Sequence, residues 1–284
     1  MTRFTSFAAV LLAASLGAPP APTPVTLDGV LHFDTDDAPV FTPDGNTAFF
    51  DRQIGDHKWV LVTYRVHGGW QPAETAPFSG HWFDQNPVLS PDGSYLLFDS
   101  DRPPHPGDAP LVQSYFGRTG PGSNVWRVDR QGGGWSEPRW LGPVVNDGPF
   151  VDFPDITGDG SLFLLKWDRG TVHIFRAQYR NGAYLPAVRV RVGVDSVPTH
   201  DAAVPPDESF MILDYGRVKG GLGRLCIAYR RGDGWSAPMD LGDTANADLP
   251  AGARLAPDGR TVYLSGSTKI WRLALGSWLP PHSP

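Results

Sequence analysis

Aspartate is the residue type that recurs in this sequence where binding or acid–base chemistry could take place. Two sets of carboxylate-rich segments repeat along the chain, before and after short apolar runs. The first set is Asp36-Asp37, Asp84-Gln85-Asn86, Asp152, His200-Asp201 and Asp248. The second set is Asp51-Arg52, Asp99-Ser100-Asp101-Arg102, Lys166-Trp167-Asp168-Arg169 and Asp214-Tyr215-Gly216-Arg217. Converging oxygens of this kind bind a hard cation such as Ca²⁺, or accept hydrogen bonds from a polar ligand such as a sugar.

A structural interpretation of the same aspartates is equally open. Aspartate caps turns, and it pairs with arginine between neighbouring structural units. If the carboxylates instead face a shared opening, they predict a ligand site. We therefore expect a site drawn from these residues: Asp36, Asp37, Asp84, Asn86, Arg102, Tyr115, Asp152, His200 and Asp201. Tyr115 belongs to a Pro/Gly-rich insertion at 103–123, whose aromatics Tyr115 and Phe116 either stack on a ligand or pack back onto their own blade.

Catalysis at this site is the alternative hypothesis. A polysaccharide hydrolase or lyase needs a pair of carboxyl groups, and the candidates are Asp36, Asp84, Asp152 and Asp201. The raised-pKa proton donor of such enzymes is commonly Glu. The sequence has only three glutamates, Glu74, Glu137 and Glu208, and all fall away from the aspartate sets. The eight histidines show no metal-ligand spacing. We favour a non-catalytic binding protein and assign no catalytic residue, no metal ligand and no cofactor beyond a cation such as Ca²⁺.

The elements that must position these side chains follow from an internal repeat. A turn sequence recurs five times, at 42–45, 90–93, 157–160, 205–208 and 256–259. Proline, aspartate and glycine suit it to a tight turn. A short apolar strand follows each turn, then a second strand pattern, a Gly turn with an aromatic residue, and a Pro-containing segment. One repeat therefore predicts about four strands, which is one blade of a β-propeller.

The ends of the sequence complete this repeat. The last repeat breaks off after Trp278. Residues 24–29 resemble the part that it lacks, because they are similar to residues 238–242, which occupy that place in the preceding repeat. We expect an all-β, five-bladed β-propeller closed by an N-terminal strand. The alternative is six blades, with a degenerate blade inside the longer second repeat. The repeated aromatics Trp70, Trp135, Tyr184, Trp235 and Trp278 are interpreted as packing residues between blades.

These repeats resemble those of the TolB-like, or PD40 (WD40-like), propellers of the bacterial cell envelope. The resemblance rests on the turn Ser90-Pro91-Asp92-Gly93, on the strand end Asp99-Ser100-Asp101-Arg102 and on the segment 120–126. Gly158 and Glu208 depart from the turn pattern. The resemblance implies an exported binding or interaction module whose partner is an envelope protein or a glycan. A structural subunit of an envelope assembly is a further alternative, and some related propellers belong to enzymes.

Composition and the first residues fit export. Residues 1–18 have the basic start, short apolar run and small residues of a signal peptide, which leaves 19–284 as a single domain. The only cysteine is Cys226, so we expect neither a disulfide nor a lipidated N-terminus. A net charge of −6 argues against nucleic acid, and no later run is apolar enough for membrane insertion. We expect a monomer that is periplasmic or secreted.

Overall fold

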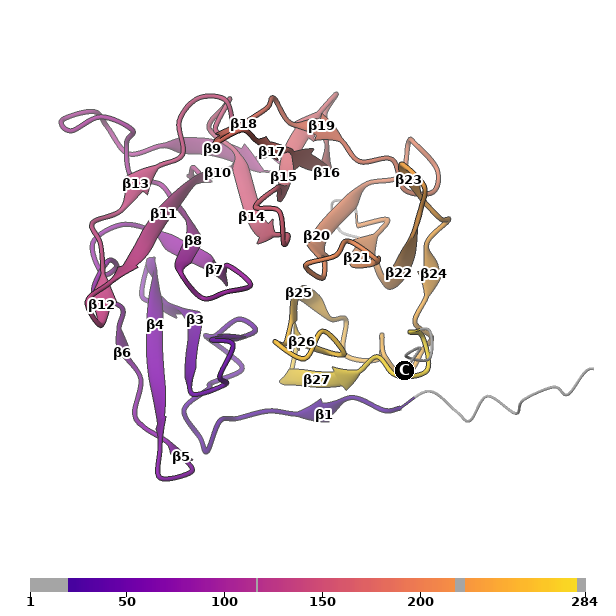
Figure 1. Cartoon of the computed structure of the whole chain (residues 1–284), viewed down its shortest axis with the longest axis horizontal. Coiled ribbons are helices and arrows are strands. Elements are labelled where there is room, and N and C mark those ends of the chain that lie inside the picture. The colour runs from indigo at the N-terminus through magenta and orange to yellow at the C-terminus, as the bar shows by residue number, and fades with distance from the viewer. Residues whose placement is uncertain (1–19, 116, 218–222, 280–284) are drawn as a thin grey trace, which may run out of the picture.

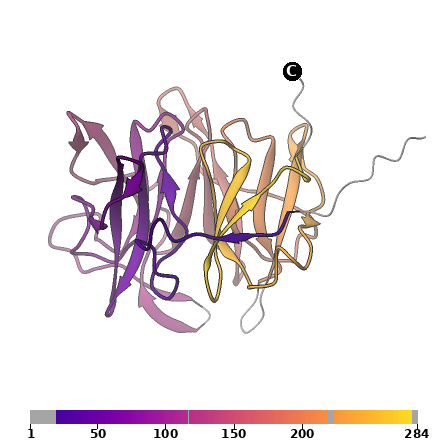
Figure 2. The ribbon, with the colours of Figure 1, turned by 90° about the horizontal axis from the view of Figure 1, so that it is seen from below.

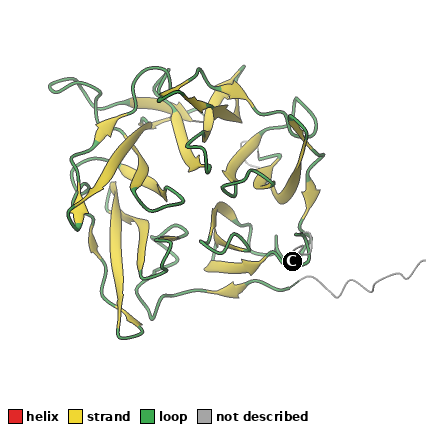
Figure 3. Cartoon of the chain, viewed as in Figure 1, coloured by secondary structure: helices red, strands yellow, loops and turns green. Residues whose placement is uncertain are grey.

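The computed structural model describes residues 20–115, 117–217 and 223–279. The first 18 residues, predicted to be a signal peptide, lie outside the described residues. Within the described ranges the chain contains strands and no helix (Figure 3). The sheets form a ring of five blades around a central channel, and chain order runs around the ring (Figure 1). The prediction of an all-β, five-bladed propeller is confirmed.

Each blade is an antiparallel sheet that runs from the channel outward. Blade 1 contains β2 (Val40–Phe41), β3 (Thr47–Ile54), β4 (His57–Val66), β5 (Gly69–Trp70) and β6 (Glu74–Thr75). Blade 2 contains β7 (Asp84–Leu89), β8 (Tyr95–Ser100), β11 (Asn124–Gln131), β12 (Gly134–Trp135) and β13 (Arg139–Trp140). Blade 3 contains β14 (Val151–Ile156), β15 (Leu162–Asp168), β16 (Thr171–Ala177) and β19 (Val188–Arg189), with a small outer hairpin of β17 (Tyr179–Arg180) and β18 (Ala183–Tyr184).

The remaining blades complete the ring. Blade 4 contains β20 (Thr199–Ala203), β21 (Phe210–Tyr215), β22 (Arg224–Arg231), β23 (Gly234–Trp235) and β24 (Met239–Asp240). Blade 5 contains β25 (Ala251–Leu255), β26 (Thr261–Ser265), β27 (Ile270–Ala274) and β1 (Thr23–Pro24). Strand β1 therefore comes from the N-terminal end of the chain and closes the ring by pairing with β27. The two strands β1 and β27 lie side by side in Figures 1 and 2. Its pairing with β27 is extended by the bond from the Val25 N–H to the Ile270 carbonyl, 2.9 Å.

The extra length of the second repeat is not a sixth blade. It forms a two-stranded hairpin of β9 (Val112–Tyr115) and β10 (Arg118–Pro121), which projects from one face of the ring (Figure 2). Among the described residues no helix is long and apolar enough to cross a membrane.

The turn sequence works as a repeated hydrogen-bonding unit. In blade 2 the Ser90 hydroxyl donates to Asp92 Oδ1 over 2.7 Å, and the same oxygen accepts the Ser94 N–H over 3.0 Å. Gly93 follows with a φ of 69°, a left-handed conformation that costs glycine nothing. The turn thus sets the hairpin between the two inner strands of a blade, and so the start of the next strand.

The hydrophobic core is divided into five clusters, one between each pair of neighbouring blades. Strand β8 shows how alternation builds them. Leu96 and Phe98 contribute to the cluster shared with blade 1, and Leu97 to the cluster shared with blade 3. Successive side chains of a strand point to opposite faces, so a run of apolar residues joins both neighbours.

Two of the repeated aromatics show the inter-blade packing expected of them. The ring of Trp135, in blade 2, lies 5.6 Å from that of Phe49 in blade 1, edge to face. Trp235, in blade 4, lies 6.1 Å from Phe163 in blade 3 in the same geometry. Both contacts join an outer strand to the preceding blade, which fits the favourable edge-to-face arrangement of aromatic pairs.

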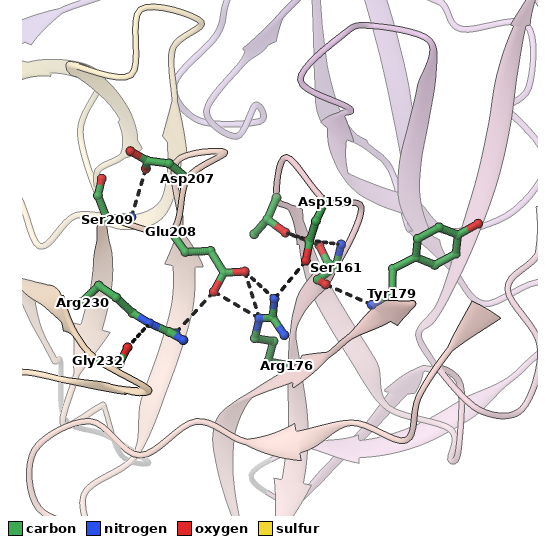
Figure 4. A network of polar contacts seen from close by, with 10 residues as sticks. Asp159, Ser161, Arg176, Tyr179, Asp207, Glu208, Ser209, Arg230 and Gly232 are labelled. Atoms are coloured by element: carbon green, nitrogen blue, oxygen red, sulfur yellow. Dashed lines mark hydrogen bonds and ion pairs between the residues drawn. The ribbon is translucent and has the colours of Figure 1, made fainter. Parts of the chain in front are cut away.

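Glu208 replaces the turn glycine of blade 4 and joins two blades (Figure 4). Its φ of 54° is left-handed, which is strained for a residue with a side chain. The carboxylate accepts from Arg176 Nη2 of blade 3 over 2.6 Å and lies 3.4 Å from Arg230 Nη1 of blade 4. The paired guanidinium groups offset the backbone strain, because charged hydrogen bonds in a partly buried site are among the stronger ones.

Changing Glu208→Gln is expected to lower the free energy of unfolding by about 1–2 kcal/mol, measured by urea unfolding. The variant keeps the strained backbone but loses the charge that faces the two arginines. Glu137→Gln is the matched control, because Glu137 is exposed on an outer segment, and it should change stability by less than about 0.5 kcal/mol. Equal stability of the two variants would mean that the contacts of Glu208 with the two arginines do not contribute to the free energy of unfolding.

Candidate functional site

A polar pocket of about 460 Å³ opens at one end of the central channel. A smaller cavity of about 170 Å³, lined by prolines of the turn sequences among other residues, opens at the other end. Arg254 lines both cavities and is only 4% exposed. The channel is therefore blocked by this side chain, and the polar mouth is a closed-ended pocket rather than a tunnel.

A repeated irregularity of the inner strands shapes the pocket wall. Blades 2 to 5 each carry a β-bulge at the same place, with one residue in the left-handed region. These residues are Asn86, Phe153, Asp201 and Gly252, with φ between 49° and 60°. A bulge adds an unpaired residue to its strand and redirects the neighbouring side chains. A bulky residue such as Phe153 at positive φ is strained, and strain of this kind gathers at functional sites.

The backbone N–H groups of bulge residues, which have no partner within their own sheet, donate hydrogen bonds to the preceding blade. Asp51 Oδ2 accepts the Asn86 N–H over 2.8 Å, and Asp99 Oδ2 accepts the Phe153 N–H over 2.7 Å. Between blades 5 and 1, Ser265 Oγ accepts the Ala38 N–H over 2.9 Å. The aspartates of the second strands thus tie neighbouring blades together beneath the pocket. The structural interpretation of the aspartates holds for these positions.

Asp99 and Asp152 form a carboxyl pair at the pocket wall. Asp99 is fully buried, and burial together with the neighbouring Asp152 carboxylate raises the pKa of Asp99 well above its usual range. The ionised form of Asp99 is therefore disfavoured. Asp152 faces the pocket, and its Oδ1 accepts from Asn86 Nδ2 over 3.0 Å and from Ser123 Oγ over 3.1 Å.

Two further clusters of carboxylates lie at the pocket, and each is held by one cation. Lys58 Nζ binds Asp51 Oδ1 over 2.7 Å and also contacts Asp37. Burial, opposed by Lys58 and reinforced by Asp37, raises the pKa of Asp51 to about 7. On the far side Arg217 Nε lies 2.7 Å from Asp214 Oδ2, and its Nη1 lies 3.6 Å from Asp201 Oδ2.

Beside this second group lies His200, which lines the pocket and is 1% exposed. Burial lowers the pKa of His200, so the ring is neutral at pH 7. A buried neutral imidazole can donate one hydrogen bond and accept another.

Arg254 is held at the channel centre by two contacts and by the charge of a nearby carboxylate. Its guanidinium lies 3.7 Å from the Phe153 ring centroid, and Nη1 donates to the Pro154 carbonyl over 3.2 Å. Asp155 supplies the opposite charge: burial raises the pKa of Asp155 to about 6, although Arg254 and two backbone N–H groups oppose the rise. The strained backbone of Phe153 thus presents its ring to the side chain that closes the channel.

The β9–β10 hairpin forms one wall of the pocket, through Gln113 and residues 118–121. The insertion therefore lies at the channel mouth, as expected. Tyr115 belongs to β9, but its side chain is not described, and Phe116 lies outside the described residues. Arg118 brings a cation to the rim.

The structure brings together five of the nine predicted site residues. Asp37, Asn86, Asp152, His200 and Asp201 all line the pocket. Asp36 and Asp84 do not. Asp36 Oδ1 pairs with Arg52 Nε over 2.6 Å, and Asp84 Oδ1 pairs with Arg102 Nη2 over 2.8 Å, with both carboxylates buried. Asp36, Asp84 and Arg102 therefore lie in ion pairs outside the lining of this pocket.

Several pocket residues were not among those predicted: Asp51, Gln85, Gln113, Arg118, Arg217 and Arg254. Asp51 and Arg217 belong to the second carboxylate-rich set, so their position in the repeat could have identified them. Arg254 carries no such sequence signal. Among the described residues no three His, Cys, Asp or Glu side chains form a group able to hold a metal ion.

Comparison with known proteins supports the fold. No protein-family model matches this sequence, and no curated protein sequence matches it. Solved structures do match. A structure described as a putative TolB from Agrobacterium tumefaciens is 15% identical, with a TM-score of 0.52, over 81% of this chain and 69% of the other. TolB from Acinetobacter baumannii is 15% identical, with a TM-score of 0.48, over 85% of this chain and 54% of that one.

A third match, described as a gluconolactonase, XC5397 from Xanthomonas campestris, is 14% identical, with a TM-score of 0.45, over 90% of this chain and 94% of that one. The fold and pocket define a five-bladed β-propeller with a closed-ended polar mouth. Its architecture is that of a TolB-like propeller, and at 15% identity this similarity concerns the fold alone.

Proposed function

We propose that this chain is an exported, non-catalytic binding propeller of the cell envelope that takes a small polar ligand into the mouth of its channel. The observation that carries the proposal is the pocket itself. It is closed by Arg254, has a volume of about 460 Å³, and is lined by groups from all five blades. Pockets of this size that combine apolar walls with a few placed polar groups are typical ligand sites.

The chemistry of the wall favours a ligand with several hydroxyl or amide groups. Side-chain amides at Gln85, Asn86 and Gln113 both donate and accept, while Asp152 and Asp201 accept. A glycan, or a polar segment of an envelope protein, offers the complementary groups. Export to the periplasm or beyond follows from the signal peptide that the first 18 residues predict.

Thermal unfolding in the presence of candidate ligands tests this function. Residues 20–284 are unfolded with neutral sugars, short polar peptides, and Ca²⁺ with EDTA as its control. A ligand at a hundredfold excess over its dissociation constant should add about 2.7 kcal/mol, which raises Tm by several degrees. Thr119→Trp, at the exposed pocket rim, should abolish the shift, whereas Thr75→Trp on an outer strand should not. The proposal is wrong if no compound raises Tm, or if the ligand raises Tm equally in Thr119→Trp and Thr75→Trp.

Hydrolysis or elimination on a polysaccharide is the second candidate function. Asp152 and Asp201 come from adjacent blades and both line the pocket, so they are the candidates for the carboxyl pair that such an enzyme needs. Asp36 and Asp84 drop out, because each is buried in an ion pair. Product release from the same glycans, lost in both Asp152→Asn and Asp201→Asn, would establish an enzyme in place of a binding protein.

A further inference from the structure

Asp152 differs from the other carboxylates of the pocket in having no cationic partner. Asp37 and Asp51 contact Lys58, and Asp201 lies near Arg217. Within the described part of the chain, no ion pair reaches Asp152. Its hydrogen-bond donors are neutral: the amides of Gln85 and Asn86 and the hydroxyl of Ser123. One negative charge therefore faces the pocket without compensation.

The geometry holds this carboxylate in place for an additional group. Gln85 Nε2 and Asn86 Nδ2 donate to the same oxygen, Oδ1, over 3.4 and 3.0 Å. Ser123 Oγ lies 3.1 Å from this oxygen and shares its one proton between Oδ1 and the Val151 carbonyl. These contacts hold Oδ1 in place. Oδ2 receives none of them, although a carboxylate oxygen accepts two hydrogen bonds. A cationic donor in the pocket would complete it, and charge-assisted bonds of this kind are short and strong.

Buried polar atoms elsewhere on the wall point to a ligand independently of the charge. His200 Nε2 and Arg254 Nη2 have no hydrogen-bond partner among the described residues, although both side chains are at least 96% buried and line the pocket. Gln113 Oε1, on the hairpin wall, is also buried and unpartnered in that part of the chain. Leaving such groups unpaired is costly, and together they offer donors and acceptors suited to hydroxyl groups.

The remaining wall is apolar. Phe83 and Phe150 line the pocket beside the hairpin, and the Phe150 ring lies 5.7 Å from that of Trp167 behind it. The aliphatic C–H face of a sugar ring packs well on such a surface, while its hydroxyls reach the polar groups. A compact body with hydroxyls on its edges therefore fits better than a linear polyamine.

We propose that the pocket binds a hydroxylated monoamine of the amino-sugar class, whose ammonium group pairs with Asp152 while its hydroxyls bond to His200, Gln113 and Arg254. This inference rests on the proposed function, because it specifies the ligand class of the same pocket. The positive charge is the specific requirement: a neutral sugar of the same shape satisfies the hydroxyl contacts but leaves Asp152 uncompensated.

Calorimetric titration of residues 20–284 with glucosamine and with glucose tests the inference. The two sugars differ by one group, ammonium against hydroxyl. Glucosamine should bind at least about tenfold more tightly, because only its ammonium group places an opposite charge beside Asp152. Asp152→Asn should remove that preference, so that the variant binds the two sugars with equal affinity. Asp44→Asn, in a turn on the opposite face, should keep it.

The outcomes separate the ligand class from the proposed function. Equal affinity for both sugars, or glucosamine binding that Asp152→Asn does not weaken, overturns the amine assignment while the pocket still binds a polar ligand. Failure of both sugars overturns the amine assignment too, and the proposed function then depends on whether another polar compound raises Tm in the wild type but not in Thr119→Trp.

Discussion

Replacing Arg254 with methionine is expected to lower the free energy of unfolding by about 3 kcal/mol at pH 8. Methionine retains much of the side-chain volume but leaves the buried Asp155 carboxylate without its cation, and the Pro154 carbonyl without its donor. Removing the cation that offsets the charge of a buried carboxylate has a large cost, because that charge stays in a low-dielectric environment. Urea unfolding at pH 5 and pH 8 measures the effect.

The pH dependence of this loss has a definite sign. Burial already raises the pKa of Asp155 to about 6 in the wild type, and loss of Arg254 raises it further. A carboxyl whose folded pKa lies above its unfolded value loses stability as pH rises through that range. Arg254→Met should therefore cost less at pH 5, where Asp155 is neutral, than at pH 8. Adding Asp155→Asn should recover most of the pH 8 loss, and additive effects of the two changes would contradict the pairing.

The fold could be predicted because the turn sequence, the strand patterns and the Gly–aromatic turn of each repeat all indicate the same unit, a four-stranded propeller blade. Turns such as Ser90–Gly93 recur at intervals that only a closed ring explains, and the N-terminal strand supplies the missing pairing partner. Ring closure depends on counting repeats, which a single sequence allows. The hairpin at 112–121 could be placed at the channel mouth from its position in the repeat, although its own strands carried no signal.

The site could be predicted only in part, because facing alternates along a strand with a period of two residues. Asp36 and Asp84 occupy equivalent positions and turn away from the pocket, whereas the next residues, Asp37 and Gln85, line it. The bulge at Asn86 then adds a residue and shifts the alternation again. A one-residue offset reverses which side chains face the channel, and nothing in the sequence marks where a bulge begins.

Arg254 shows the same limit from the opposite direction. Its equivalents in the other inner strands are Val40, Val88, Asp155 and Ala203, which have no chemistry in common. The cation at the channel centre occurs in one blade alone, so a pattern shared by the repeats does not indicate it. Its importance follows only from what surrounds it: the strained Phe153, the raised pKa of Asp155, and a cavity on each side.

Changing Asp99→Asn is expected to flatten the fall of stability with rising pH. Burial and the adjacent Asp152 raise the pKa of Asp99 well above its usual range, and burial raises the pKa values of Asp51 and Asp214 to about 7. For all three the folded state binds more protons than the unfolded chain above about pH 4, so stability decreases from pH 5 to pH 8. Asparagine at 99 is neutral throughout and removes one contribution.

Asparagine also preserves the hydrogen bonds at this position. Asp99 Oδ2 accepts from the Phe153 N–H and from Asn86 Nδ2, which leaves Oδ1 as the oxygen on which a proton would sit. The amide reproduces both roles, with its oxygen accepting and its nitrogen donating. Relative to the wild type, the variant should gain at least about 1 kcal/mol between pH 5 and pH 8 in urea unfolding.

The control is Asp92→Asn in a turn, where hydrogen bonds from Ser94 and Ser90 lower the pKa of the carboxyl to about 2. A depressed pKa gives stability that is lost only below about pH 4, so Asp92→Asn should run parallel to the wild type from pH 5 to pH 8. If Asp99→Asn also runs parallel, Asp99 is ionised in the folded protein. Asp152 would then face a second negative charge rather than a proton, and the pocket would carry one more unit of negative charge at its wall.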